Sequence, residues 1–163
     1  MPDWISTDAA ILDVGAGSAV WSLTLAKEKT GATVTAVDWK AVLEVAVESA
    51  EQLGLSNRLT TVAGNYHEVE LPAEKFDLVI LANVTHLETP EGNARLLTRA
   101  RQTLKPHGRI AIIDVFAGQP QGDLNRTLYA LGLAMRTKQG RIYSRDELAV
   151  LLRASGFTAP QLL

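Results

Sequence analysis

Two kinds of apolar segment alternate along almost the whole sequence. Short runs dense in Val, Ile, Leu and Ala predict five strands, at residues 9–14, 32–38, 58–64, 76–84 and 108–116. Longer runs with apolar residues at helical spacing predict helices at 19–31, 40–55, 89–105, 123–138 and 144–156. This alternation predicts an α/β fold with a doubly wound, mainly parallel sheet and helices on both faces. Continuous apolar runs are typical of strands that are buried on both faces.

Several predicted helices carry recognisable end signals. Gly31 and Gly54 are predicted to stop the first two helices, because glycine is common just past a helix C-terminus. Thr89 is a predicted N-cap for the third helix. Ser144 and Glu147 have the spacing of a capping box at the start of the last helix. The final residues, 157–163, are expected to begin an extended segment.

The composition describes an ordinary globular chain. Its 163 residues fit one domain, 47% are apolar and 21% are charged. A net charge of -2 gives no general attraction to nucleic acid or acidic membranes, so neither partner is expected. The chain has no cysteine, which excludes disulfides, thiolate metal sites and a cysteine nucleophile. No signal-peptide pattern or membrane-length apolar run is visible, and a soluble, cytoplasmic protein is expected.

Polar residues gather where the predicted strands end. Ligands of parallel sheets bind beyond the carboxyl ends of the strands. That rule selects five segments, at residues 13–19, 38–39, 64–65, 83–86 and 114–116. The same places hold most of the chemically interesting side chains, so we expect them to form one site.

Gly15 and Gly17 follow the first predicted strand in the segment ILDVGAGSAVW. Glycines let the backbone turn sharply and approach a ligand, and the helix that follows favours an anion. A dinucleotide loop would need glycine at position 20, where the chain has Val20, and a phosphate loop would need Gly-Lys-Ser/Thr. The glycines alone leave open both a cofactor loop and a turn that needs glycine only for its geometry.

Asp38 ends the second predicted strand, about 20 residues after the loop, where an acidic side chain can accept hydrogen bonds from ribose hydroxyls. Its alternative role is a surface carboxylate that caps the next helix. Trp39 could cover an adenine ring, or it could be a half-buried packing residue. Asn83 could reach a cofactor or cap a turn.

Residues 11–39 resemble the cofactor-binding start of class I S-adenosylmethionine-dependent methyltransferases, which have a Rossmann-like fold. Their first motif, acidic-x-Gly-x-Gly-x-Gly, is matched except that Ala19 replaces the third glycine. The resemblance implies S-adenosyl-L-methionine as cofactor. It also places Gly64-Asn65 where the family often has a Gly-Asp pair near the adenine. The cofactor-binding residues implied together are Asp13, Gly15, Ala16, Gly17, Asp38, Trp39, Gly64, Asn65 and Asn83.

Residues 76–116 resemble the plant-type small-molecule O-methyltransferases and their bacterial relatives. In that family a histidine after strand four is the general base, and an acidic residue after strand five holds it. His86 and Asp114 match these positions, whereas Glu88 stands where the family usually has an aromatic residue. The resemblance implies methyl transfer to a hydroxyl of a small-molecule acceptor. The alternatives are an N- or C-methyltransferase, an NAD-type oxidoreductase, a catalytically inactive binding module, and a His86 without a chemical role.

No acidic cluster has metal-ligand spacing, so no metal site is predicted. His107 is interpreted as a structural residue in a turn, and His67 as loop surface. The helix at 123–138 has an apolar face predicted mostly to pack in the core, with some members lining an acceptor pocket. That face comprises Leu128, Tyr129, Leu131, Leu133 and Met135.

Two parts of the family pattern have no counterpart in the sequence: the N-terminal dimerisation domain and the terminal strand hairpin. We expect residues 1–163 to form one S-adenosylmethionine-binding methyltransferase domain. Whether that domain is a fragment of a longer protein with a dimerisation domain is left open. A homodimer is left open for the same reason.

Overall fold

A computed structural model describes residues 5–118, 124–158 and 160–161. The chain divides into two compact units. The first comprises the chain up to Ala82 together with Gln102–Ile113, and the second comprises Asn83–Arg101 together with the chain from Asp114. Among the described residues, no helix is both long and apolar enough to cross a bilayer.

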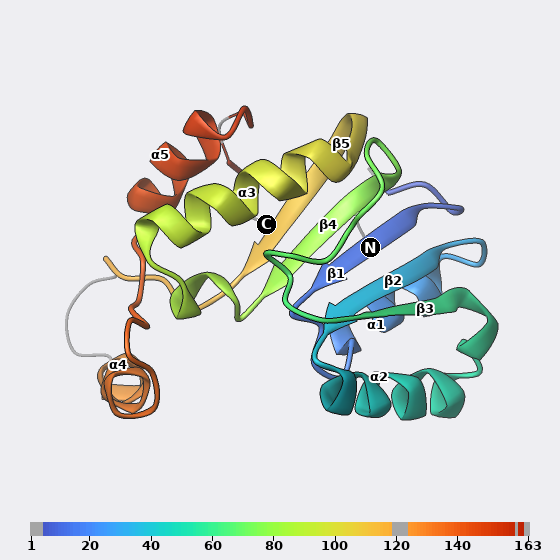
Figure 1. Cartoon of the computed structure of the whole chain (residues 1–163), viewed down its shortest axis with the longest axis horizontal. Helices are drawn as coiled ribbons and strands as arrows, with labels where there is room; N and C mark the ends of the chain where they lie inside the picture. Colours follow the sequence, from blue (N-terminus) through green and yellow to red (C-terminus); the bar gives the residue numbers. More distant parts are fainter. Residues whose placement is uncertain (1–4, 119–123, 159, 162–163) are drawn as a thin grey trace. The chain divides into compact units, whose positions relative to one another are not determined.

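The first unit is built on a five-stranded, all-parallel sheet in the order β3-β2-β1-β4-β5 (Figure 1). The strands are β1 (Ala10–Val14), β2 (Thr33–Asp38), β3 (Leu59–Ala63), β4 (Phe76–Ala82) and β5 (Leu104–Ile113). Helices α1 (Val20–Glu28) and α2 (Lys40–Leu53) and the short 3-10 helix η1 (Ser56–Arg58) belong to the same unit. The predicted α/β fold with a parallel sheet is therefore confirmed.

The core of the first unit lies between the sheet and its two long helices. Side chains from one face of the sheet, such as Ile11 and Val34, cluster with Leu23 of α1 and Leu43 of α2. The residues that point to the other face are buried as well. They include Leu12, Val14, Val37, Val79 and Leu81. Burial on both faces explains why the strand sequences are continuously apolar.

Strand β5 differs from the sequence prediction. It begins at Leu104 rather than at residue 108, and it ends at Ile113. Phe76 pairs with Leu104, and Leu78 pairs with Arg109, so an advance of two residues along β4 corresponds to an advance of five residues along β5. The surplus residues form an irregularity that accommodates a proline and a positive φ of 67° at His107. The interpretation of His107 as a residue in a turn between helix and strand is therefore wrong.

The end of α1 also differs from the prediction. The helix ends at Glu28, and Lys29 has an extended backbone, so Gly31 is not its stop signal. A Cβ on Gly31 would lie 3.2 Å from the backbone of Asp8, which explains the glycine there by close approach. Gly54 does end α2 as predicted, in the left-handed conformation with φ 71°.

The second unit contains η2 (Thr85–Leu87), most of α3 (Pro90–Thr103), α4 (Leu124–Arg136) and α5 (Arg145–Ala154). Both predicted caps are confirmed. Thr89 Oγ1 accepts a hydrogen bond from Gly92 N, and Ser144 and Glu147 form a reciprocal capping box. Residues 157–158 and 160–161, the described residues after α5, are not in a strand.

Candidate functional site

The glycine loop between β1 and α1 is tied to the end of β2. Gly15 N and Ala16 N both donate to Val37 O, at 2.9 and 3.1 Å. Gly17 N donates to Asp38 Oδ2 at 2.9 Å. Gly17 has a φ of +57°, and a Cβ added there would meet no atom within 4 Å. Hydrogen bonds to the end of β2 therefore fix one side of the loop. The space next to the Cα of Gly17 is open.

Ala19, which occupies the third glycine position of the family motif, takes the backbone conformation of a glycine. It is the N-cap of α1 with φ 55° and ψ 25°, in the left-handed region. Its side chain is fully buried in the core of the first unit. An alanine is the smallest side chain that can be placed there, which explains why this departure from the motif preserves the turn.

Asp13 lies enclosed under the loop, with 1% of its surface exposed. Ser22 Oγ of α1 donates to Asp13 Oδ2 at 2.5 Å. Asp13 Oδ1 has no hydrogen-bond partner among the described residues. Burial raises the pKa of this carboxyl to about 6, and the charge of Asp38 acts in the same direction, while Ser22 opposes both. In this structure Asp13 joins β1 to the first turn of α1.

Asp38 and Trp39 stand at the carboxyl end of β2. The two carboxylate oxygens of Asp38 accept hydrogen bonds from Gly17 N and Trp39 N, at 2.9 and 2.7 Å. Each oxygen keeps acceptor capacity for a further donor. The Trp39 side chain is 61% exposed, so the alternative of a half-buried packing residue is wrong. A half-buried carboxylate and an exposed indole thus adjoin the open side of the glycine loop.

Gly64 and Asn65 follow β3 in the same unit. Gly64 N donates to Asp38 O at 2.9 Å, which ties this loop to the end of β2. The Asn65 side chain organises its own turn, because Oδ1 accepts from His67 N and Nδ2 donates to Glu68 Oε1, both at 3.0 Å. Contact of Asn65 with an adenine stays a prediction.

His86 and Asp114 form a buried pair in the second unit. His86 Nδ1 lies 2.8 Å from Asp114 Oδ1, and their side chains are 7% and 2% exposed. Thr85 Oγ1 and His86 N donate to Asp114 Oδ2 at 2.6 and 3.2 Å, and Val115 N donates to Oδ1 at 2.8 Å. Burial raises the pKa of Asp114, but the hydrogen bonds from His86 and Thr85 outweigh it and hold that pKa below its ordinary value. An ionised Asp114 accepts from Nδ1–H, which leaves the Nε2 lone pair as the basic position of the ring.

The loop that carries His86 is held by further hydrogen bonds. Asn93 Nδ2 donates to Thr85 O at 2.9 Å, and Arg141 N donates to His86 O at 2.8 Å. Tyr143 Oη donates to Glu88 O at 2.6 Å. Glu88 is buried, and a Cβ at Gly92 would collide with its carboxylate. Gly92 therefore makes room for the acidic residue that replaces the family's aromatic.

Tyr129, predicted only as a member of the apolar face of α4, contacts His86. Its Oη lies 3.3 Å from both ring nitrogens of His86, and the two rings meet edge to face. Burial and the charge of Asp114 raise the pKa of Tyr129, so its hydroxyl stays protonated. The four-residue spacing between Tyr129 and the buried Leu133 was the available signal, because both lie on one helix face.

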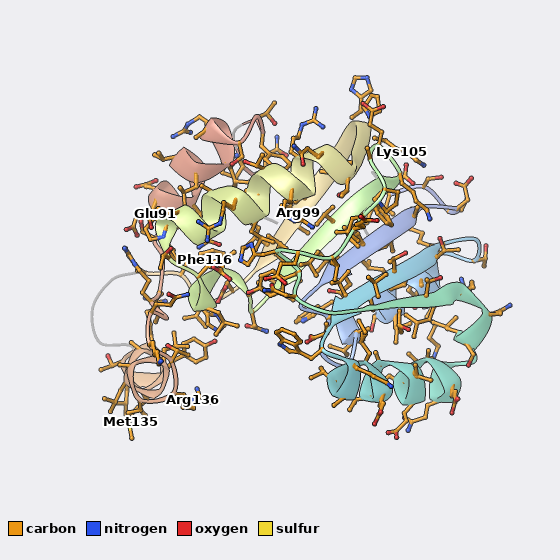
Figure 2. All side chains as sticks on the ribbon, viewed as in Figure 1. Glu91, Arg99, Lys105, Phe116, Met135 and Arg136 are labelled. Atoms are coloured by element: carbon orange, nitrogen blue, oxygen red, sulfur yellow. The ribbon has the colours of Figure 1, made fainter. Side chains whose placement is uncertain are left out.

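The remaining apolar residues of α4 do not pack in a core. Leu128, Leu131 and Met135 are 54%, 56% and 78% exposed, so the predicted core role is wrong for these three. Figure 2 shows the side chains of Met135 and Arg136 at the end of α4.

The predicted residues therefore fall into two groups. The glycine loop, Asp38, Trp39 and Gly64-Asn65 belong to the first unit, and Asn83, His86 and Asp114 belong to the second. Asn83 is exposed with φ 58°, a conformation that asparagine tolerates better than most residues. In the first unit, hydrogen bonds join the glycine loop and Gly64 to the end of β2, and in the second unit His86 and Asp114 are in contact. Their union into one site stays a prediction.

The fold and the two groups of residues define a class I methyltransferase domain. Residues 11–108 match the family model described as a methyltransferase domain, and the chain belongs to that family. S-adenosylmethionine is the methyl donor of the class, and structures similar to this chain have been solved with S-adenosylmethionine or S-adenosylhomocysteine bound.

Two curated relatives align with almost the whole chain. Demethylspheroidene O-methyltransferase of Cereibacter sphaeroides is 27% identical over 150 residues, which cover 91% of this chain and 39% of the relative. L-tyrosine C(3)-methyltransferase of Streptomyces lavendulae is 28% identical over 159 residues, covering 94% and 42%. The chain thus spans about two fifths of the length of these relatives.

A solved structure gives a close match in fold. A candidate O-methyltransferase of Nostoc punctiforme superposes with a TM-score of 0.90 at 27% identity, covering 96% of this chain and 48% of that one.

The residues of the first unit fit S-adenosylmethionine. The space above Gly17 leaves room at the loop where no side chain intrudes. The Asp38 carboxylate can accept bonds from ribose hydroxyls in addition to its two backbone donors, and the exposed Trp39 ring offers a flat apolar surface to a purine.

Proposed function

We propose that the protein transfers a methyl group from S-adenosylmethionine to a hydroxyl group of a small molecule, with His86 as general base. The observation that carries this proposal is the buried His86–Asp114 pair, at 2.8 Å. A carboxylate on Nδ1 fixes the ring tautomer and makes Nε2 the proton acceptor. His86 and Asp114 match the positions of the catalytic histidine and its acidic partner in the O-methyltransferase family, which supports these two roles.

S-adenosylmethionine, when bound, supplies a methyl group that its sulfonium charge has already activated. His86 Nε2 takes the proton of the acceptor hydroxyl as the oxygen forms its bond to the methyl carbon. S-adenosylhomocysteine would be the leaving group, and its sulfur would keep the electron pair of the bond to the methyl carbon. Asp114 keeps the ring oriented and stabilises the positive charge that the proton brings to it. Such a base is worth about 10²–10⁴-fold in rate.

The proposal assigns the cofactor to the residues predicted from the sequence. Asp38 receives the ribose and Trp39 covers the adenine. The open side of the loop at Gly15, Ala16 and Gly17 faces the methionine part. Asp13 contributes indirectly, because its hydrogen bond with Ser22 fixes the start of α1. Asn65 and Asn83 stay predicted contacts. The cytoplasmic location, the small-molecule partner and the homodimer also stay predictions.

Transfer to carbon is the second candidate, because one of the two relatives is named as a C-methyltransferase. A tyrosine phenol next to the reacting carbon would also need a base, so His86 would serve either reaction. Transfer to nitrogen, nicotinamide chemistry and a binding module without turnover are tested as outcomes below.

The proposal is tested with methyl-¹³C-labelled S-adenosylmethionine and a panel of phenols, catechols, hydroxylated polyenes, aromatic amines and free tyrosine. The product's carbon spectrum states whether the label sits on oxygen, nitrogen or carbon. We expect O-methyl products. Label on carbon or nitrogen alone would replace the hydroxyl assignment. Calorimetry measures the binding of S-adenosylhomocysteine and of NAD to the same protein. Binding of NAD alone would contradict the proposal, and so would binding of the cofactor without turnover of any acceptor.

A further inference from the structure

The hydroxyl of Tyr129 lies beside His86 in a position that the proposed mechanism does not use. Its oxygen is 3.3 Å from Nδ1 and 3.3 Å from Nε2. A hydroxyl on the lone-pair axis of Nε2 would be much closer to Nε2 than to Nδ1, because that axis points away from Nδ1. Equal distances place the oxygen off both in-plane axes, over the face of the ring. The lone-pair axis of Nε2 is therefore not the one that Tyr129 occupies.

The His86 ring needs a second contact to have a fixed plane. Its backbone is held at both ends of the peptide, by the bonds from His86 N to Asp114 and from Arg141 N to His86 O. The ring is attached through Cγ, and the bond from Nδ1 to Asp114 holds a second atom, but the ring can still swing about the line that joins these two points. Tyr129 meets the ring from α4, with ring centroids 5.5 Å apart and planes at 85°. This edge-to-face contact opposes the swing.

We propose that Tyr129 is a positioning residue for His86: its ring and hydroxyl hold the imidazole plane so that Nε2 keeps one direction. The effect on turnover rests on the proposed function, whereas the effect on the ring does not. A small displacement of Nε2 from the acceptor hydroxyl removes much of the rate advantage of the base. The contact therefore matters for catalysis even though Tyr129 transfers no proton.

The test compares Tyr129→Phe, which removes only the hydroxyl, with Tyr129→Leu, which removes the aromatic ring as well. The ring is followed in the full chain by ¹⁵N-histidine NMR, as the rate at which the Nδ1 proton of His86 exchanges with water. We expect exchange about tenfold faster in Tyr129→Phe and faster still in Tyr129→Leu. Turnover of the panel phenol with the highest rate should show kcat lower by about 10-fold and 10²-fold, with KM for S-adenosylmethionine within about 2-fold.

Thr98→Ala is the control, because it removes another hydroxyl of the same unit, one that donates to Ala94 O within α3. It should leave the exchange of the His86 proton unchanged. Equal exchange in Tyr129→Phe and the wild type would overturn the inference, as would acceleration of the same size in Thr98→Ala. If His86→Ala keeps full turnover while Tyr129→Phe accelerates exchange, the proposed base fails and the positioning contact stands.

Discussion

The buried carboxyl of Asp13 makes stability depend on pH in a direction opposite to that of most carboxylates. Its pKa is about 6 in the folded chain against an ordinary 3.8, because burial disfavours the charged form. Between these values the folded state holds more protons than the unfolded state, so the free energy of unfolding falls as pH rises through that window. Each pKa unit corresponds to about 1.4 kcal/mol, so ionised Asp13 costs the folded chain ~3 kcal/mol above pH ~6.

Asp13→Asn removes this cost and keeps an oxygen that can accept from Ser22 Oγ. The free energy of unfolding, measured by urea titration, should therefore rise relative to the wild type, and the difference should grow by ~2 kcal/mol between pH ~4.5 and pH ~7.5. A difference that stays constant across this range would show that Asp13 does not carry this pH dependence. Asp8→Asn is the control, because the Ser6 hydroxyl, which donates to Asp8, lowers the pKa of that exposed carboxyl from its ordinary 3.8, so its contribution to stability changes only below pH ~4 and the Asp8→Asn difference should stay constant between pH ~4.5 and pH ~7.5.

Two further substitutions probe the loop and the pair. In Ala19→Gly, relief of the left-handed backbone would stabilise the folded chain. Loss of the buried methyl group and the greater conformational freedom of the unfolded chain would destabilise it. Each of these contributions is about 1 kcal/mol. Ala19→Gly should therefore change stability by less than ~1 kcal/mol, whereas Ala19→Val should cost more than ~2 kcal/mol in the same titration; equal effects would contradict this. Asp114→Asn should lower kcat on the order of 10² or more, with unchanged affinity for S-adenosylhomocysteine; undiminished kcat would remove the orienting role.

The strand and helix order could be predicted from the sequence because apolar patterning and caps act locally. Ser144 with Glu147 and Gly54 were correct since each signal needs only its own turn of helix. The start of β5 was missed because pairing with β4 is a tertiary effect that overrides the proline and glycine of the KPHGR segment. Gly31 was wrongly predicted to end α1 for a similar reason, because a glycine is needed there where the backbone of Asp8 comes close.

The candidate site was predicted in part. His86 and Asp114 were paired through a family resemblance, and the structure places them in contact. The support from Thr85 and Tyr129 was missed, because hydrogen-bond partners between separate elements leave no spacing pattern in one sequence. The burial of Asp13 was missed too, since an acidic residue in a motif does not reveal whether its carboxyl faces a ligand or a helix.

His86 is the residue that we propose as the base for methyl transfer to a hydroxyl group. The most direct test of this role is the single-turnover rate of labelled methyl transfer by wild type and His86→Ala, with the phenol of the panel that the wild type methylates fastest and S-adenosylmethionine saturating. We expect a loss of about 10²–10⁴-fold in that rate, with the affinity for S-adenosylhomocysteine, measured by calorimetry, unchanged. A rate in His86→Ala within about twofold of the wild type would contradict it.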